Sequence, residues 1–134
     1  MIEIAGIDHI VLRTASPDAL VTFYRDVLGC RIERQLPAEI GLIQLRAGSA
    51  LIDIVPVESQ LGRKGGGPPD PRARNLDHLC LQVRGMSEEQ LAEWLGSHGI
   101  EAPEFERRYG ATGFGNSVYV DDPDGNTVEL KLVD

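Results

Sequence analysis

The chain has 134 residues, which is the length of one ordinary domain. Hydrophobic residues make up 42% of the sequence and charged residues 25%, close to the averages of globular proteins, so a disordered or fibrous chain is excluded. The net charge of −8 repels phosphate backbones, and nucleic acid is therefore not expected as a partner.

No signal peptide and no apolar run of membrane-spanning length can be read in the sequence, so we expect a cytoplasmic protein with no membrane partner. Its two cysteines, Cys30 and Cys80, are far apart and form no CxxC motif. They are interpreted as reduced thiols, with a single disulfide as the alternative.

An internal repeat organises the chain. Residues 7–12 read Ile-Asp-His-Ile-Val-Leu, and residues 76–81 read Leu-Asp-His-Leu-Cys-Leu. Further along each copy, 51–54 resembles 127–130, with an acidic residue at the same place. Two copies are too few for a solenoid, so the repeat predicts two small modules that pack together.

The first copy is predicted to open with a strand over 7–13. Ser16 is expected to cap a helix whose first residue is Pro17 and which ends at Gly29. Apolar residues recur on one face of this helix: Leu20, Phe23, Val27 and Leu28. Three strands are expected to follow, near 31–36, 40–46 and 49–57.

The second copy repeats this order. A strand over 76–84 precedes a helix that begins with a Ser87–Gln90 capping box and ends at Gly99. Its apolar stripe is Leu91, Trp94 and Leu95. Weaker strands are expected near 102–107, 116–121 and 126–132, with a tight turn at 122–125 before the last. The prediction is therefore an α+β domain made of two βαβββ modules, over 1–57 and 76–134.

Residues 58–75 connect the modules and are rich in glycine and proline. The segment has no periodicity and is longer than most compact connections. It is interpreted as a flexible linker, with a lid over a site as the alternative. It is not a phosphate-binding loop, because neither Ser nor Thr follows its lysine and no helix follows its glycines.

Period-2 alternation gives each of four strands one aliphatic face and one face with a polar residue able to bind a metal. These residues are His9, Asp53, His78 and Glu129. A single histidine on a strand is more often structural. Here, however, two histidines stand at equivalent places in the two copies, and each copy carries an acidic residue on a later strand. Burying two unpaired acids in a sheet is costly, and a cation removes that cost. Two imidazoles and two carboxylates therefore point to a divalent-metal site.

Longer motifs add a family resemblance. They are Ile7-Asp8-His9-Ile10, the FYRDVLG stretch over 23–29, Leu76-Asp77-His78, and the stretch over 119–130 that contains DPDGN. Together they resemble the vicinal oxygen chelate superfamily, which includes glyoxalase I, fosfomycin-resistance enzymes, extradiol dioxygenases and bleomycin-binding proteins. The resemblance covers nearly the whole chain outside 58–75.

The resemblance implies mixed sheets curled around a central metal-binding cleft, with one divalent ion (Ni, Zn, Mn, Co or Fe) held by His9, His78 and Glu129. Asp53 lies where glyoxalase-like members usually have Glu, and its shorter side chain leaves three arrangements open. It binds the metal directly, binds it through water, or acts beside a three-ligand site. Glu129 or Asp53 is the candidate catalytic base.

By strand parity, four further residues could face the cleft and bind substrate: Gln44, Ser117, Tyr119 and Arg108. The implied function is that of a metal-dependent glyoxalase-like lyase or isomerase, which chelates a small substrate through two adjacent oxygens. The alternatives are an extradiol-type dioxygenase, a fosfomycin-type thiol transferase, and a metal-free protein that sequesters a drug. The resemblance also favours a homodimer, with modules paired within a chain or swapped between chains.

Overall fold

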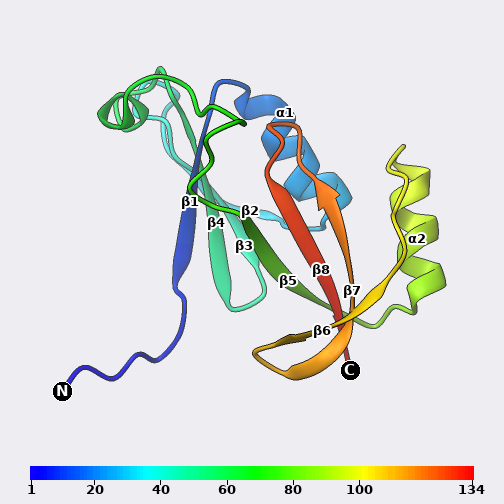
Figure 1. Ribbon diagram of the computed structural model, residues 1–134. Helices are drawn as coiled ribbons and strands as arrows, with labels where there is room; N and C mark the ends of the chain where they lie inside the picture. The colour runs from blue at the N-terminus through cyan, green and yellow to red at the C-terminus, as the bar shows by residue number, and fades with distance from the viewer. The chain divides into compact units, whose positions relative to one another are not determined.

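The computed structural model describes every residue from Met1 to Asp134. The chain divides into two compact units, Met1–Ala73 and Arg74–Asp134 (Figure 1). Each unit contains a four-stranded mixed sheet and a helix between its first and second strands. The α+β class and the repeated βαβββ order predicted from the sequence are therefore confirmed.

The first unit contains β1 (His9–Thr14), α1 (Pro17–Thr22), β2 (Ile32–Gln35), β3 (Ile43–Ala47) and β4 (Ala50–Pro56). Its strands lie in the order β1-β4-β3-β2. The outer strand β1 is parallel to β4, whereas the other pairs are antiparallel. The first strand of the unit, β1, therefore lies beside its last strand, β4.

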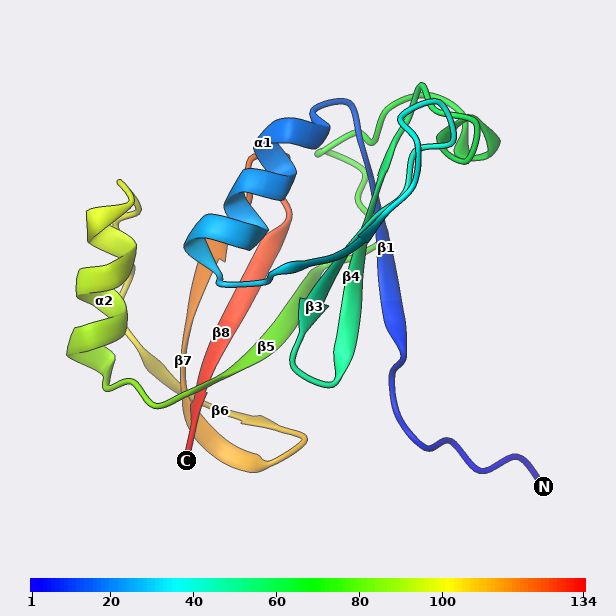
Figure 2. The same ribbon diagram turned by 180° about the vertical axis from the view of Figure 1, so that it is seen from behind.

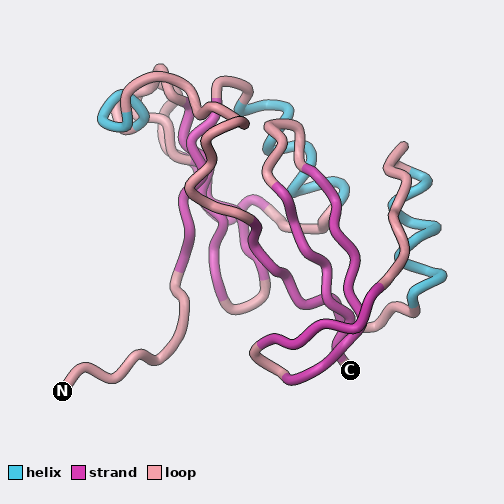
Figure 3. Tube along the Cα trace, viewed as in Figure 1, coloured by secondary structure: helices cyan, strands magenta, loops and turns pink.

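The second unit contains β5 (His78–Arg84), α2 (Glu88–Ser97), β6 (Glu106–Gly110), β7 (Gly113–Asp121) and β8 (Thr127–Val133). Its strand order, β5-β8-β7-β6, with β5 parallel to β8, repeats that of the first unit (Figures 2 and 3). The sequence repeat therefore corresponds to a repeat of topology.

The first helix differs from its prediction in two ways. Ser16 is the N-cap residue and Pro17 begins the helix, as predicted, but the Ser16 side chain makes no capping hydrogen bond. The Ser16 backbone N–H instead donates to the Thr14 hydroxyl at 2.9 Å. After Thr22 the helix widens into a π-helical turn, Phe23–Val27, which places Tyr24 in the core with no exposed surface.

The second helix follows its prediction more closely. The Ser87 hydroxyl accepts from the Gln90 N–H at 3.2 Å, and the Gln90 side chain accepts from the Ser87 N–H at 2.9 Å. Leu91 and Leu95 of the predicted stripe are buried, whereas Trp94 stays 41% exposed. The capping box therefore sets the beginning of α2, and two of its three stripe residues anchor it.

Replacing Ser87 with alanine should remove one half of this box. The Gln90 N–H then has no side-chain acceptor, and the loss of such a cap typically costs about 1 kcal/mol. Urea denaturation followed by circular dichroism should show that loss in the free energy of unfolding. Ser87→Asp should keep most of the stability, because aspartate also accepts at this position, and an unchanged Ser87→Ala midpoint would contradict the capping role.

The predicted alternation along the strands is confirmed in the core. Ile52 and Ile54 of β4 and Val128 and Leu130 of β8 are at most 2% exposed. The second strand of the second unit is displaced, because β6 begins at Glu106 and the sequence placed it near 102–107. Its position follows from pairing with β7 across the two-residue turn at 111–112, and Gly113, the first residue of β7, adopts a φ of 87°.

Part of the connector at 58–75 has regular structure, whereas the sequence analysis interpreted this segment as a flexible linker. A 3₁₀ helix spans Gly62–Gly65, and the Arg13 guanidinium donates to three carbonyls around it, at Gly62, Gly66 and Gly67. A Cβ on Gly65 would lie 2.2 Å from the Nε of Arg13, so a larger residue there would displace the Arg13 side chain. The connector is thus packed on the end of β1.

Both cysteines are free, as predicted, with Cys30 buried and Cys80 exposed. No helix has the length and apolar character needed to cross a membrane.

Candidate functional site

In the first unit, His9 and Asp53 lie on the same face of neighbouring strands. The parallel register pairs Val11 of β1 with Asp53 of β4, and His9 is two residues from Val11, so all three side chains share a face. The His9 side chain is 46% exposed, whereas Asp53 is only 3% exposed. The unit therefore places an accessible imidazole near a buried carboxylate.

The tautomer of His9 is set by the residue before it. The Nδ1 of His9 lies 2.6 Å from the Asp8 carboxylate. A carboxylate accepts hydrogen bonds, so Nδ1 carries the proton and, in the neutral ring, Nε2 keeps a free lone pair. This hydrogen bond is the main reason that the pKa of His9 is raised above its usual value, and the charge of Asp53 adds to the rise.

Asp53 is held by an amide and forms no ion pair. The Gln44 Nε2 lies 3.3 and 3.2 Å from the two carboxylate oxygens of Asp53, directly across the β3–β4 register. The Gln44 carbonyl accepts in turn from Arg34 at 3.3 Å. Gln44 was predicted to bind substrate, and in the structure its amide group orients Asp53.

In the second unit, the equivalent histidine and acid are in direct contact. The Nε2 of His78 lies 3.3 Å from the Oε1 of Glu129. Glu129 is 6% exposed and lies between Cys80 on β5 and Tyr119 on β7 in the strand register. This unit therefore brings a predicted imidazole and a predicted carboxylate together.

An aspartate precedes His78 as well. The Asp77 carboxylate lies 2.7 Å from the Nδ1 of His78, which leaves the Nε2 of His78 directed at Glu129. The same hydrogen bond lowers the pKa of Asp77. The sequence analysis assigned no role to Asp8 or Asp77, although the repeated Asp-His dipeptide was the signal that could have identified them.

Two protonated groups flank Glu129. Burial, and then the negative charge of Glu129, raises the pKa of the Cys80 thiol to about 11. The same two causes raise the pKa of Tyr119 above its usual value. Both groups therefore keep their protons at neutral pH, and neither adds a negative charge beside Glu129.

Arg108 and Ser117, both predicted to bind substrate, lie next to Tyr119. The guanidinium of Arg108 is centred 4.2 Å from the Tyr119 ring, and its Nη1 donates to the carbonyl and the hydroxyl of Ser117, both at 2.8 Å. The Tyr119 ring in turn meets the His78 ring edge-on at 5.4 Å between centroids. Ser117 itself has no exposed surface, so its hydroxyl anchors Arg108.

The four predicted metal ligands are thus distributed as two pairs, one per unit. No three His, Cys, Asp or Glu side chains gather into a metal-binding group. The predicted four-residue group draws on both units, and neither unit supplies it alone. Each pair nevertheless combines an imidazole with a buried carboxylate that lacks a Lys or Arg partner, a donor set that suits a divalent cation.

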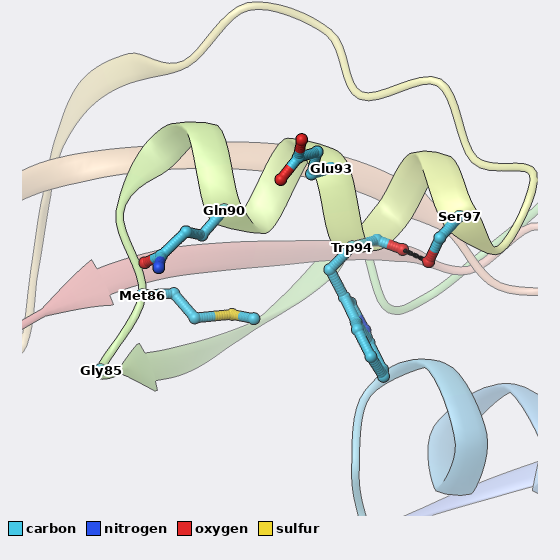
Figure 4. A pocket seen from close by; sticks show the side chains of 6 residues that line it. All are labelled: Gly85, Met86, Gln90, Glu93, Trp94 and Ser97. Carbon is cyan, nitrogen blue, oxygen red and sulfur yellow. Dashed lines mark hydrogen bonds between the residues drawn. The ribbon is translucent and has the colours of Figure 1, made fainter.

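A separate hollow lies along α2 and contains none of the predicted site residues. It is lined by Gly85, Met86, Gln90, Glu93, Trp94 and Ser97 (Figure 4). The Ser97 hydroxyl donates to the Trp94 carbonyl at 2.6 Å, within the helix itself. With one carboxylate and neither His nor Cys, the lining of this hollow does not form a metal-binding set.

Comparisons with known proteins identify the family of the chain. Residues 6–130 match the model of the glyoxalase/bleomycin resistance protein/dioxygenase superfamily. The chain is 30% identical over 127 residues to virulence protein STM3117 of Salmonella typhimurium, covering 93% of this chain and 82% of that protein.

Solved structures share the fold. An integron cassette protein of V. cholerae is 26% identical, covers 100% of this chain and 99% of its own, and superposes with a TM-score of 0.73. A lactoylglutathione lyase from Agrobacterium tumefaciens, at 24% identity and a TM-score of 0.64, covers 97% of this chain and 95% of its own. At that identity the second likeness shows the fold alone.

Proposed function

Because the chain belongs to the glyoxalase/bleomycin resistance protein/dioxygenase superfamily, we propose that it is a divalent-metal-dependent lyase or isomerase of the glyoxalase type. Its substrate would be a small oxygen-rich molecule or thiol conjugate that offers two adjacent oxygens to the metal. The observation that supports this proposal is that each unit holds an imidazole, whose Nδ1 is bonded to the preceding aspartate, on the same sheet face as a buried carboxylate.

The burial of the two carboxylates is the physical reason for a metal. Asp53 and Glu129 are 3% and 6% exposed, and neither has a Lys or Arg partner. Burying a neutral polar group without a hydrogen bond costs on the order of 2–7 kcal/mol, and burying an ionised carboxylate costs more. The imidazole of His78 is the one ion-pair partner of Glu129. A divalent ion shared by His9, His78, Glu129 and Asp53 would offset that cost, with Ni, Zn, Mn, Co and Fe as candidates.

The residues around such a site would have separate chemical roles. The ion, when bound, would polarise two substrate oxygens and stabilise the negative charge that develops on them. Glu129 or Asp53 would accept the proton that the substrate loses. The Gln44 amide fixes the direction of the Asp53 carboxylate, and the protonated Tyr119 hydroxyl would donate to an oxygen bound beside Glu129.

Turnover assays test the proposal. The protein, stripped with a chelator and then reloaded with single metals, should isomerise the hemithioacetal of methylglyoxal and glutathione only in the reloaded forms. Oxygen uptake with a catechol, dependent on Fe(II), would favour the dioxygenase alternative instead. Tight binding of an apolar drug by a protein that takes up no metal would favour sequestration.

Replacing Asp77 with asparagine should weaken metal binding without removing a ligand. The carboxylate that fixes the His78 tautomer becomes an amide, and the loss of such an outer partner typically costs 10–100-fold in metal affinity. Competition with a fluorescent chelator measures the change. Asp8→Asn should have a comparable effect through His9, and wild-type affinity in both variants would show that the Asp-His pairs do not serve a metal.

We also propose that the protein is cytoplasmic and forms a homodimer. Its two free thiols suit a reducing compartment. Sedimentation at micromolar concentration tests the assembly, since a homodimer should have twice the mass of the 14.6 kDa chain.

A further inference from the structure

The segment that precedes β1 carries exposed apolar side chains. Residues 1–8 have no regular structure, and Figures 1 and 2 show them running away from the strands of their unit. Ile2, Ile4 and Ile7 are 86%, 81% and 75% exposed. The first residue joined to the sheet is Asp8, whose carbonyl accepts from the Leu51 N–H at 3.0 Å. Residues 1–7 therefore have a backbone free to pair with another strand.

The outer edge of β6 carries a second group of exposed apolar side chains. β6 is the last strand of its sheet, and only β7 pairs with it. Tyr109 and its register partner Phe114 are 74% and 59% exposed, and their rings meet edge-on at 5.1 Å between centroids. The turn of this hairpin points away from α2 (Figures 1 and 2), so the helix of the unit does not cover the rings. The corresponding edge strand of the first unit, β2, has only Ile32 in this class, at 38%.

The alternation of side chains decides how a strand added to β6 would face. On one side of β6 lie Tyr109 and Arg107, whose guanidinium stacks on the Phe114 ring at 3.8 Å. On the other side lie Glu106 and Arg108, which form an ion pair. The two isoleucines at positions 2 and 4 share one face of an extended segment, so a shift of one residue moves both between these sides. They favour the aromatic side, since β-branched and aromatic side chains are favourable neighbours across strands.

A second copy of the chain would cover both features at once. A foreign partner on β6 would leave the isoleucines exposed, whereas each copy in a twofold dimer donates one N-terminal segment and receives one. We infer that residues 1–5 of one protomer add a strand to β6 of its partner, with Ile2 and Ile4 against Tyr109. This inference rests on the proposed homodimer and is independent of the proposed metal chemistry.

Sedimentation equilibrium measures the contact. The double substitution Ile2→Ser and Ile4→Ser should raise the dimer dissociation constant by at least about tenfold, because it removes apolar area that the contact buries. Tyr109→Ser should weaken the dimer from the other side of the contact, with circular dichroism to show that the fold is kept. Ile7→Ser is the matched control. Ile7 is comparably exposed but lies beyond the five residues that β6 can pair, so this variant should dimerise like the wild type.

An equimolar mixture of the double variant and Tyr109→Ser tests whether the segment reaches a second copy. A mixed dimer contains one intact contact, and removing both partners of the other contact costs little more than removing one. The mixture should therefore associate more tightly than either variant alone, and a mixture with no gain would overturn the exchange. Wild-type dissociation constants in both variants would also overturn it while leaving the homodimer intact. A wild-type chain that stays monomeric at all concentrations would refute the homodimer and this contact together.

Discussion

Glu129→Gln should lower the affinity for divalent metal by more than about 100-fold, beyond the loss expected for an outer partner. The substitution keeps the shape of the side chain but replaces a charged oxygen donor with a neutral amide. The Nε2 of His78, 3.3 Å from the Oε1 of Glu129, would then lack its anionic companion. Chelator competition gives the affinity, and circular dichroism shows whether the fold is kept.

Glu104→Gln removes the same charge from an exposed loop and is the control for this experiment. It should bind metal like the wild type. Equal metal affinities in both variants and the wild type would mean that Glu129 is a structural residue, hydrogen-bonded to its neighbours in the sheet. The second unit would then contribute no carboxylate ligand to the proposed metal site.

The second large effect is expected in the connector. A Cβ on Gly62 would lie 1.9 Å from the Pro56 carbonyl oxygen, and backbone atoms cannot move aside as a flexible side chain can. Gly62→Ala should therefore destabilise the protein by about 1–3 kcal/mol or more, the usual cost of forcing atoms into a packed region. Urea denaturation followed by circular dichroism measures the change.

Gly67→Ala provides the comparison within the same segment. A Cβ there meets nothing within 4 Å, so the stability should stay within about 0.5 kcal/mol of the wild type, as at most surface positions. Similar midpoints for the two variants would mean that 62–67 does not pack on β1 and Pro56 in solution.

These predictions depend on features that the sequence reveals to different degrees. Strand alternation placed His9, Asp53, His78 and Glu129 on polar faces, because a period of two follows from the geometry of a strand itself. The Ser87 capping box was also predictable, since both of its partners lie within one turn of the helix. Local patterns of this kind need no knowledge of distant contacts.

The features that were missed depend on distant parts of the chain. The order of the connector comes from Arg13, which is 49 residues from Gly62 in the sequence. The hydrogen bond from Gln44 to Asp53 required the β3–β4 register, and the burial of Ser117 required the position of Arg108. Neither hydrophobic periodicity nor helix capping carries this information.

The widening of α1 after Thr22 has no sequence signal either. Its consequence is a fully buried Tyr24, a residue outside the predicted apolar stripe of Leu20, Phe23, Val27 and Leu28. A stripe drawn with the 3.6-residue period of an α-helix necessarily fails where the helix contains a π-helical turn.

The metal content of the protein purified without added metal tests the central claim most directly. Elemental analysis should give about one divalent transition metal per chain, as a site with three or four protein ligands retains its ion, and His78→Ala should lose it. Less than roughly a tenth of an ion per chain, with no uptake when Ni²⁺, Zn²⁺, Mn²⁺, Co²⁺ or Fe²⁺ is titrated in, would contradict the account.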